Sequence, residues 1–129
     1  MDGVNSGPTQ GGGSSQALEQ VFIDAARAGK LVRLVEDGER ERLAEPHMVY
    51  RDRHGRPMLH IYQVGGYSSS RGDGRGWRNV PLGRFTAAEV VDRRFVAERD
   101  YNPTNEEKFP HVIFAIPTRD GRTREPDGE

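Results

Sequence analysis

The expected fold is decided by residues 55–85, which read GRPMLHIYQVGGYSSSRGDGRGWRNVPLGRF. Residues 58–64 and 77–82 have the composition of strands, with branched and aromatic side chains and no helical period. Residues 65–76, which separate them, are rich in glycine and serine and form too long a link for a tight hairpin turn. A loop of this length inside a small domain is typically functional or mobile. The sequence therefore predicts two strands joined by a loop suited to binding.

Positive charge is concentrated in the same part of the chain. Residues 51–84 contain seven arginines and two aspartates, a local balance of +5, whereas the formal net charge of the chain is −1. If the protein binds an anion, this is the part expected to hold it. The wider region of residues 16–117 has 16 basic and 15 acidic residues. That balance is far from the strongly basic composition of a general nucleic-acid-binding protein.

Composition bounds the class of protein. The chain has 129 residues, of which 33% are hydrophobic, and the apolar ones gather between residues 17 and 117. We expect one folded domain at residues 16–117, with disordered tails at 1–15 and 118–129. The absence of cysteine excludes disulfides and thiolate metal sites and fits a reducing compartment. No signal-peptide pattern and no membrane-length apolar run is present, so a cytoplasmic protein without a membrane partner is expected.

One helix should precede the strands. Apolar residues at positions 17, 21, 25 and 28 follow the helical period, and Gly29 stands where a helix-ending glycine belongs, which predicts a helix at residues 15–28. Residues 31–36 and 39–44 flank the turn dipeptide Asp37-Gly38 and predict a hairpin. Charges alternate with apolar residues along its second strand, so its outer face should be solvated. Pro46 ends or bends this strand before residues 47–50 resume it.

The remaining segments complete a mainly β structure. Within residues 58–64, Leu59 and Ile61 are expected on one face and His60 and Tyr62 on the other. Residues 85–91 predict a strand, with a turn of helix as the alternative. The apolar run at 112–116 predicts a final strand buried on both faces. One helix followed by five to seven short strands, at these turn spacings, is typical of a small barrel.

The motifs along the chain resemble the WYL domain, and most closely a group of small stand-alone WYL-like bacterial proteins. The resembling residues are Glu45-Pro46-His47, Gly55, Leu59, Tyr62-Gln63, Gly66, Ser68, Ser70, Gly76-Trp77-Arg78, Phe95 and residues 99–103. The resemblance covers residues 16–117 and rests on the order and spacing of all these motifs together. Two features depart from the family. Pro57-Met58-Leu59 replaces the Trp-Tyr-Leu triplet, and residues 1–15 are expected to be too short and too polar for the usual winged-helix DNA-binding domain.

The resemblance implies a fold and a function. The fold would be a five-stranded SH3-like (Sm-like) barrel preceded by a helix. WYL domains commonly act as ligand-sensing modules in bacterial transcription regulators, and some bind single-stranded nucleic acid or nucleotide-like effectors. The expected partner is therefore a nucleotide or a short single strand, together with a separate DNA-binding or other regulatory protein on which the chain acts in trans.

The candidate site combines aromatic, polar and basic side chains. Trp77 could offer a stacking face and Arg78 a phosphate fork, the pairing that single-stranded nucleic acid sites use. The alternative is that Trp77 packs at the barrel mouth and Arg78 is a solvated strand residue. His47, Tyr62 and Gln63 have similar structural alternatives, and the other arginines could be ordinary surface residues. The residues expected to bind a ligand are His47, Arg56, Tyr62, Gln63, Ser68, Ser70, Trp77, Arg78 and Arg84.

The sequence gives little support to catalysis. The four histidines lack paired metal-ligand spacing, and Ser68-Ser69-Ser70 lacks the context of a nucleophile. The run at residues 72–76 resembles a phosphate loop, but a strand and not a helix is expected after it. The sequence therefore predicts a non-enzymatic binding module without metal or cofactor. The alternative is an SH3-like protein–protein interaction module, which takes a peptide on a strand edge or an aromatic groove.

Overall fold

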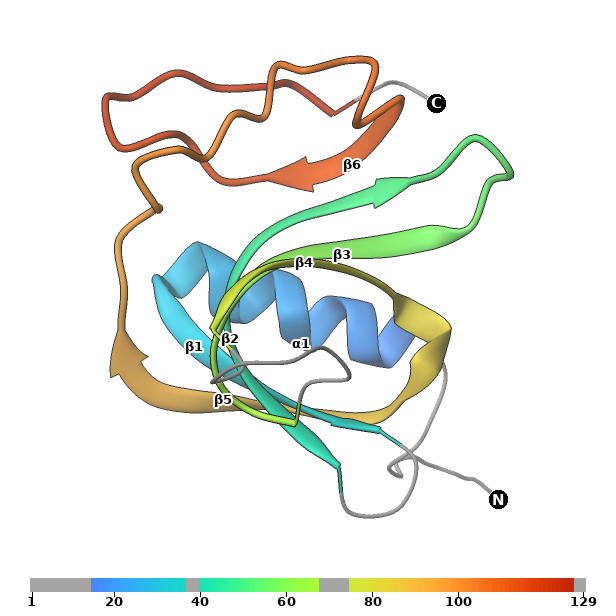
Figure 1. The fold of residues 1–129 in the computed structure, drawn as a ribbon, viewed down its shortest axis with the longest axis vertical. Helices are drawn as coiled ribbons and strands as arrows, with labels where there is room; N and C mark the ends of the chain where they lie inside the picture. The colour runs from blue at the N-terminus through green and yellow to red at the C-terminus, as the bar shows by residue number, and fades with distance from the viewer. Residues whose placement is uncertain (1–14, 37–39, 68–74, 127–129) are drawn as a thin grey trace, which may run out of the picture.

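The computed structural model describes residues 15–36, 40–67 and 75–126 (Figure 1). The elements in chain order are α1 (Ser15–Ala28), β1 (Lys30–Glu36), β2 (Glu41–Arg51), β3 (Pro57–Gly66), β4 (Gly76–Pro81), the 3-10 helix η2 (Leu82–Arg84), β5 (Phe85–Arg94) and β6 (His111–Ala115). The predicted helix and the strands predicted at residues 31–36, 58–64 and 77–82 are confirmed. The turn predicted at Asp37-Gly38 lies outside the described residues.

In the described part of the chain, six strands form one antiparallel sheet in the order β4-β3-β2-β1-β5, with β6 paired to β2. β3 follows one edge of β2 along most of its length. The other edge is shared, because residues 41–44 pair with β1 and residues 48–51 pair with β6. The structure is therefore mainly β with one α-helix, as predicted. The described strands do not pair β4 with β5, so the sheet is not closed into the expected barrel.

β2 bends where it changes partner. The register against β3 shifts between Pro46 and Met48, which leaves one extra residue in β2. Proline has no N–H to donate to a neighbouring strand, and an extra residue increases the local bend of a strand. Of the two possibilities predicted for Pro46, bending the strand is the one observed.

One hydrophobic core lies on the face of the sheet that α1 covers. The helix contacts β1, β2, β5 and η2 (Figure 1). Its buried Leu18, Phe22 and Ala25 recur at helical spacing and therefore share one face. They pack with side chains that alternate along the strands, namely Val32, Leu34, Ala44, Val49, Leu59, Ile61 and Val80.

A further core lies on the opposite face of β2 and β3. Side chains of neighbouring strand residues point to opposite faces, so Met48 and Met58 turn away from α1. They are covered by residues 95–110, which have no regular secondary structure and contribute the buried rings of Tyr101 and Phe109. The predicted assignment of β3 side chains to two faces is confirmed. Both faces are buried there, which explains why the strand reads as almost continuously apolar.

One prediction about strands is wrong, and β2 also contains a buried charge that the sequence analysis did not indicate. Arg42 is 2% exposed, and its Nε donates to Glu36 Oε2 at 2.7 Å. Arg42 lies on the same inward face of β2 as Ala44, so its burial follows from the strand register. Its charge is balanced by the Glu36 carboxylate. β6 is a strand as predicted, but it lies at an edge of the sheet and only Val112 within it is buried. For residues 85–91 the strand is observed and not the helical turn.

Hydrogen bonds also involve the end of the described chain. Residues 118–126, expected to be a disordered tail, are held by hydrogen bonds. Thr118 N donates to Arg122 O at 2.8 Å, and Arg124 Nη1 donates to Pro103 O at 3.1 Å. The first bond lies within the segment, and the second joins the segment to Pro103. Residues 1–14 and 127–129 of the predicted tails lie outside the described residues. In the described part of the chain, no helix is both long and apolar enough to cross a membrane.

Candidate functional site

Trp77 lies in a cluster of aromatic rings on the face of the sheet opposite α1. The strand register places Glu45, Tyr62 and Trp77 side by side across β2, β3 and β4. The indole ring stacks on His60 with 4.5 Å between ring centroids and 4° between the planes. The Tyr62 ring meets it edge-on at 5.4 Å. The structure thus brings Tyr62 and Trp77 together, as the predicted site requires, but His60 already occupies one face of the indole.

Beside these rings lies a small pocket of about 190 Å³, here named the Trp77 cleft. Its lining residues are His60, Trp77, Asp100, Asn102, Asn105, Lys108 and Phe109. Sites for whole small molecules usually measure about 300–1,000 Å³. The cleft therefore has room for a single ring system and not for a complete nucleotide.

His47 has a structural position. The side chain is fully buried, its Nδ1 donates to Glu45 O at 2.9 Å, and its Nε2 accepts from Glu98 N at 3.1 Å. Burial lowers the pKa of His47 to about 4, so the ring is neutral at pH 7. Both ring nitrogens are used within the chain, which favours the structural alternative for this residue. It joins β2 to the irregular segment that follows β5.

Gln63 is also buried and fully bonded. Its Oε1 accepts from Arg42 Nη1 at 3.0 Å, and its Nε2 donates to Tyr67 O at 2.6 Å and to Gly65 O at 3.1 Å. These bonds satisfy the inward-facing arginine and fix the end of β3. These contacts favour the structural alternative for Gln63, because both ends of its carboxamide bond within the chain.

The three arginines predicted to bind a ligand lie in different elements of the structure. Arg78 belongs to the opposite face from Trp77, and its Nη1 donates to Trp77 O at 2.9 Å. Arg56 lies in the β2–β3 turn, where its Nε is 2.9 Å from Asp52 Oδ2. Arg84 is exposed in η2. Ser68 and Ser70 lie outside the described residues.

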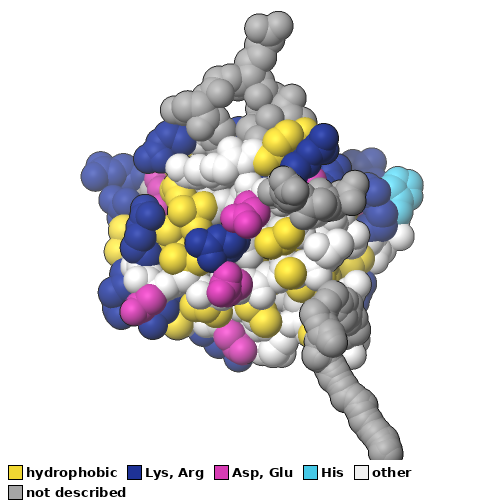
Figure 2. All heavy atoms as spheres, turned by 90° about the horizontal axis from the view of Figure 1, so that it is seen from below, with side chains coloured by type: hydrophobic (Ala, Val, Ile, Leu, Met, Phe, Trp, Pro, Cys, Tyr) yellow, Lys and Arg dark blue, Asp and Glu magenta, His cyan; other side chains and the backbone are white. Residues whose placement is uncertain are grey.

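Surface charge is mixed and not gathered into one patch on the face that Figure 2 shows. Lys and Arg side chains lie there among Asp and Glu side chains and exposed hydrophobic groups. Ion pairs explain part of this mixing. Arg33 lies 3.3 Å from Glu41 and 2.8 Å from Glu89, and Lys30 lies 3.1 Å from Asp92. On the face that Figure 2 shows, basic side chains therefore do not form a separate patch.

Sequence reasoning missed a pair of carboxyl groups, Glu45 and Glu98. Burial and the adjacent Glu98 carboxyl, through a hydrogen bond and its charge, raise the pKa of Glu45 to about 8, while the charges of Arg75 and Arg119 act in the opposite direction. Glu45 Oε1 is buried and accepts no hydrogen bond from any described residue. Glu45 and Glu98 are far apart in the sequence, so no linear motif could have indicated the pair.

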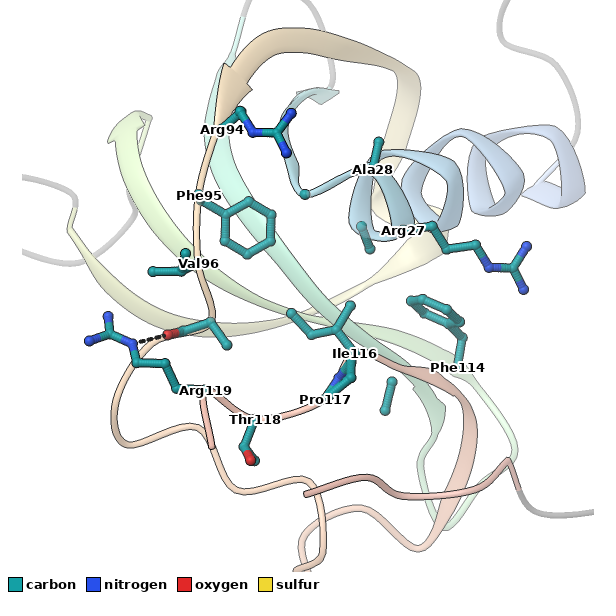
Figure 3. Close-up of a pocket in the computed structure, with 14 residues that line it drawn as sticks. Arg27, Ala28, Arg94, Phe95, Val96, Phe114, Ile116, Pro117, Thr118 and Arg119 are labelled. Carbon is teal, nitrogen blue, oxygen red and sulfur yellow. Dashed lines mark hydrogen bonds between the residues drawn. The ribbon is translucent and has the colours of Figure 1, made fainter. Parts of the chain in front are cut away.

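A larger pocket, about 590 Å³ in volume, lies where α1 ends (Figure 3). We name it the helix-end pocket, lined by residues 26–29, 94–97 and 114–119. Figure 3 shows Phe95, Phe114 and Ile116 around its centre, and Arg27, Arg94 and Arg119 spaced around its rim. Its volume is within the range of sites that hold whole small molecules.

The rim of this pocket is positively charged. No acidic side chain occurs among the described residues that line it. Arg119 Nε donates to Ala97 O at 2.9 Å, and the Arg27 guanidinium lies 5.3 Å from the centre of the Phe114 ring. Neither Arg27 nor Arg94 forms an ion pair with a described residue. The pocket thus combines an apolar interior with cationic groups that remain available to an anion.

No feature of the sequence indicated the helix-end pocket. Its arginines come from three separate segments and belong to no motif, and all three lie outside the arginine-rich residues 51–84. Phe95 was noted only as part of the family resemblance. In the described part of the chain, no group of three or more His, Asp or Glu side chains is placed to hold a metal ion.

Comparison with known proteins supports the fold. No family model and no curated protein matches the chain. A solved structure, that of proteasome accessory factor B/C (PafBC) of Arthrobacter aurescens, is similar with a TM-score of 0.54 and 21% sequence identity. The similarity covers 78% of this chain and 15% of that protein. At this identity the likeness shows a shared fold alone, and this chain corresponds to a small part of the larger protein.

Proposed function

We propose that this chain is a non-enzymatic ligand-sensing module that binds a small organic anion of nucleotide type in the helix-end pocket. One observation carries the proposal. The pocket has an apolar interior, three arginines on its rim and no acidic side chain among its described lining residues. This combination suits a molecule with a flat apolar part and a phosphate group.

The chemistry of the lining separates the two ends of such a ligand. Phe95, Phe114 and Ile116 offer apolar contacts for a base or sugar. Arginine suits phosphate, because its planar fork of N–H donors matches pairs of phosphate oxygens and stays charged at any physiological pH. A nucleotide would therefore place its base inward and its phosphate toward Arg94 or Arg119.

The resemblance to WYL domains supports the same class of ligand, since some of these bind nucleotide-like effectors or single-stranded nucleic acid. The fold is also shared with part of a protein named as an accessory factor, which is compatible with a regulatory role. We infer that the chain passes its signal to a separate regulatory protein. A ligand in the pocket would contact α1, residues 94–97 and residues 114–119 at once, and so fix these three segments relative to one another.

Exposed apolar side chains favour a second candidate function, that of a protein–protein interaction module. Val96, on the rim of the helix-end pocket, is 65% exposed, and Val90 on β5 is 42% exposed. β5 pairs only with β1 among the described strands, so its other edge can accept a strand from a partner. Binding that depends little on salt would favour this function, whereas phosphate binding weakens as salt rises.

The test is a titration with adenosine monophosphate and with a short single-stranded oligonucleotide, followed by backbone amide NMR at low and moderate salt. We expect saturable shifts at residues 26–29, 94–97 and 114–119 that weaken as salt rises. Arg94→Ala should weaken binding at least about tenfold, in line with the loss of a charge-assisted hydrogen bond. Arg93→Ala is the matched control, since Arg93 is exposed on β5 and outside the pocket. No shifts at low salt, or equal loss in both variants, would contradict the proposal.

A further inference from the structure

The Trp77 cleft contains a hydrogen-bond acceptor that no described residue uses. His60 is only 4% exposed. Asn79 Oδ1 lies 2.9 Å from His60 Nδ1 and also accepts from the Tyr50 hydroxyl at 3.1 Å. A carboxamide oxygen only accepts, so the proton of the imidazole is on Nδ1 and Nε2 carries the lone pair. Since His60 lines the cleft and Nε2 has no partner in the described chain, this acceptor is available to a ligand.

Asp100 supplies further acceptor capacity at the edge of the indole. The Trp77 indole stacks on His60 at 4.5 Å, and its Nε1 donates to Asp100 Oδ1 at 3.1 Å. The second carboxylate oxygen accepts no hydrogen bond from a described residue. The indole therefore contacts both a carboxylate and a neutral imidazole that line the same cleft. Burial lowers the pKa of His60 to about 4, which keeps its acceptor unprotonated at neutral pH.

The remaining polar groups of the cleft are donors. Asn102 Oδ1 accepts from Thr104 N at 3.2 Å and from Thr104 Oγ1 at 2.7 Å, and Asn105 Oδ1 accepts from Lys108 N at 3.1 Å. Because these carboxamide oxygens are engaged within the loop, the NH₂ groups remain for a ligand. The Lys108 ammonium, 5.8 Å from the centre of the Phe109 ring, adds a charged donor.

We propose that the Trp77 cleft binds a single guanine-type base, a flat heterocycle with two adjacent N–H donors and a carbonyl oxygen. The N–H edge would face Asp100 and His60, and the carbonyl oxygen and ring nitrogen would face the amide and ammonium donors. A water molecule occupies about 30 Å³ in the liquid, so a cleft of about 190 Å³ holds one heterocycle in place of several waters. The cleft shares no lining residue with the helix-end pocket, so this site goes beyond the proposed function and is tested separately.

Trp77 makes the test direct, because it is the only tryptophan in the chain. The full-length protein is titrated with guanosine, inosine and cytidine, which carry no phosphate, while tryptophan fluorescence and the indole N–H resonance are followed. Guanosine should give a saturable change that is insensitive to salt. Inosine lacks the exocyclic amino group, so we expect it to bind at least about tenfold more weakly, as for a lost hydrogen bond to a charged acceptor. Cytidine should bind more weakly still.

Asp100→Asn tests the carboxylate without removing the acceptor for the indole N–H. It should weaken guanosine binding at least about tenfold, because one carboxylate oxygen becomes a donor. Asp92→Asn, on exposed β5, is the matched control and should bind normally. If Asp100→Asn alters folding by circular dichroism, the exposed Asn105→Ala takes its place, with a several-fold loss expected. No saturable response to guanosine, equal responses to all three nucleosides, or unchanged binding in these variants would overturn the proposal.

Discussion

Glu45 shows how one buried side chain makes stability depend on pH. Its pKa is raised from 4.5 to about 8, first by burial and then by the hydrogen bond and the charge of Glu98, so the folded state holds a proton that the unfolded chain releases above pH 4.5. A raised pKa contributes stability that is complete below pH 4.5 and is lost as the pH rises through about 8. Arg75 and Arg119, which act in the opposite direction, limit the effect without reversing it.

Glu45→Gln should therefore stabilise the protein at high pH. The carboxamide resembles the protonated carboxyl and cannot ionise. We expect the variant to gain about 1–2 kcal/mol of unfolding free energy at pH 8, after allowance for partial exposure, and almost nothing at pH 4.5. Denaturant unfolding at a series of pH values measures this. Glu106→Gln, an exposed position, is the control. A difference between Glu45→Gln and the natural protein that did not grow with pH would contradict the assignment.

Position 66 requires glycine, because a side chain there would collide with the backbone of β2. It has φ +91°, and a Cβ there would lie 2.3 Å from Glu41 O, a backbone atom that cannot move aside easily. Gly55 has a similar φ of +82° but open space where a Cβ would be. We predict that Gly66→Ala destabilises by about 3 kcal/mol or more, whereas Gly55→Ala costs about 1–2 kcal/mol from backbone strain alone. If thermal unfolding shows that Gly66→Ala and Gly55→Ala lose the same stability, the backbone of β2 moves away from position 66 without cost, which would contradict this prediction.

Among the elements, the irregular segment at residues 95–110 has a role that its lack of regular secondary structure conceals. It covers one face of β2 and β3, and Tyr101 joins it to the backbone of His47 and of Ile116. The Tyr101 hydroxyl donates to Ile116 O at 2.9 Å and lies 3.3 Å from His47 O. Burial raises the pKa of Tyr101 well above its usual value, so the hydroxyl remains a donor at all ordinary pH values.

Tyr101→Phe should loosen this segment without removing its packing. The ring remains, but Ile116 O loses its buried donor, which costs about 1–2 kcal/mol. Tyr62→Phe is the matched control, because no hydrogen bond of the Tyr62 hydroxyl to a described residue is found, and it should change stability little. Hydrogen exchange of the amides at residues 95–104 should rise in Tyr101→Phe. Similar losses of stability in Tyr101→Phe and Tyr62→Phe would argue that the Tyr101–Ile116 hydrogen bond does not hold the segment in place.

For the molecule as a whole, a single curved sheet separates two cores, and histidines on one side of it are buried as neutral rings. His47 and His60 both have pKa values lowered to about 4 by burial, from a usual value of 6.5. A lowered pKa contributes stability that is present above pH 6.5 and is lost as the pH falls through about 4. Glu45 changes in the opposite direction over part of this range, so it masks the effect.

Acid unfolding is therefore best followed in the Glu45→Gln variant. There, we expect the unfolding free energy to fall steeply between pH 6.5 and pH 4, by roughly 3 kcal/mol for each histidine at most. The loss should occur before the structural aspartates are protonated, since hydrogen bonds from Arg56 and Thr118 lower the pKa values of Asp52 and Asp120 from 3.8. Stability that stays constant down to pH 4 would show that these histidines are not buried as neutral rings.

Much of the local structure was available from the sequence. The helical period of residues 17–28 and the stop at Gly29 depend on neighbours in the chain, as does the alternation of side chains in β3, and these were predicted correctly. The alternation of charges did not indicate that Arg42 is buried, because burial depends on register, and register is set by pairing between distant strands. β6 lies at the edge because β1 pairs only with residues 41–44 of β2 and leaves residues 48–51 to pair with β6. No property of residues 111–115 themselves indicates this.

Local patterns in the chain were enough to predict the helix, most of the strands, the mainly β class and the placement of Tyr62 and Trp77 in one region. Periodicity and turn chemistry act over a few residues, so they can be read from a linear chain. Contacts between distant segments determine that His47 and Gln63 bond within the chain, that the predicted arginines lie apart, and that Glu45 meets Glu98; these depended on the folded structure. It also decided the helix-end pocket, because the walls of a pocket come from segments that are neighbours only after the sheet has brought them together.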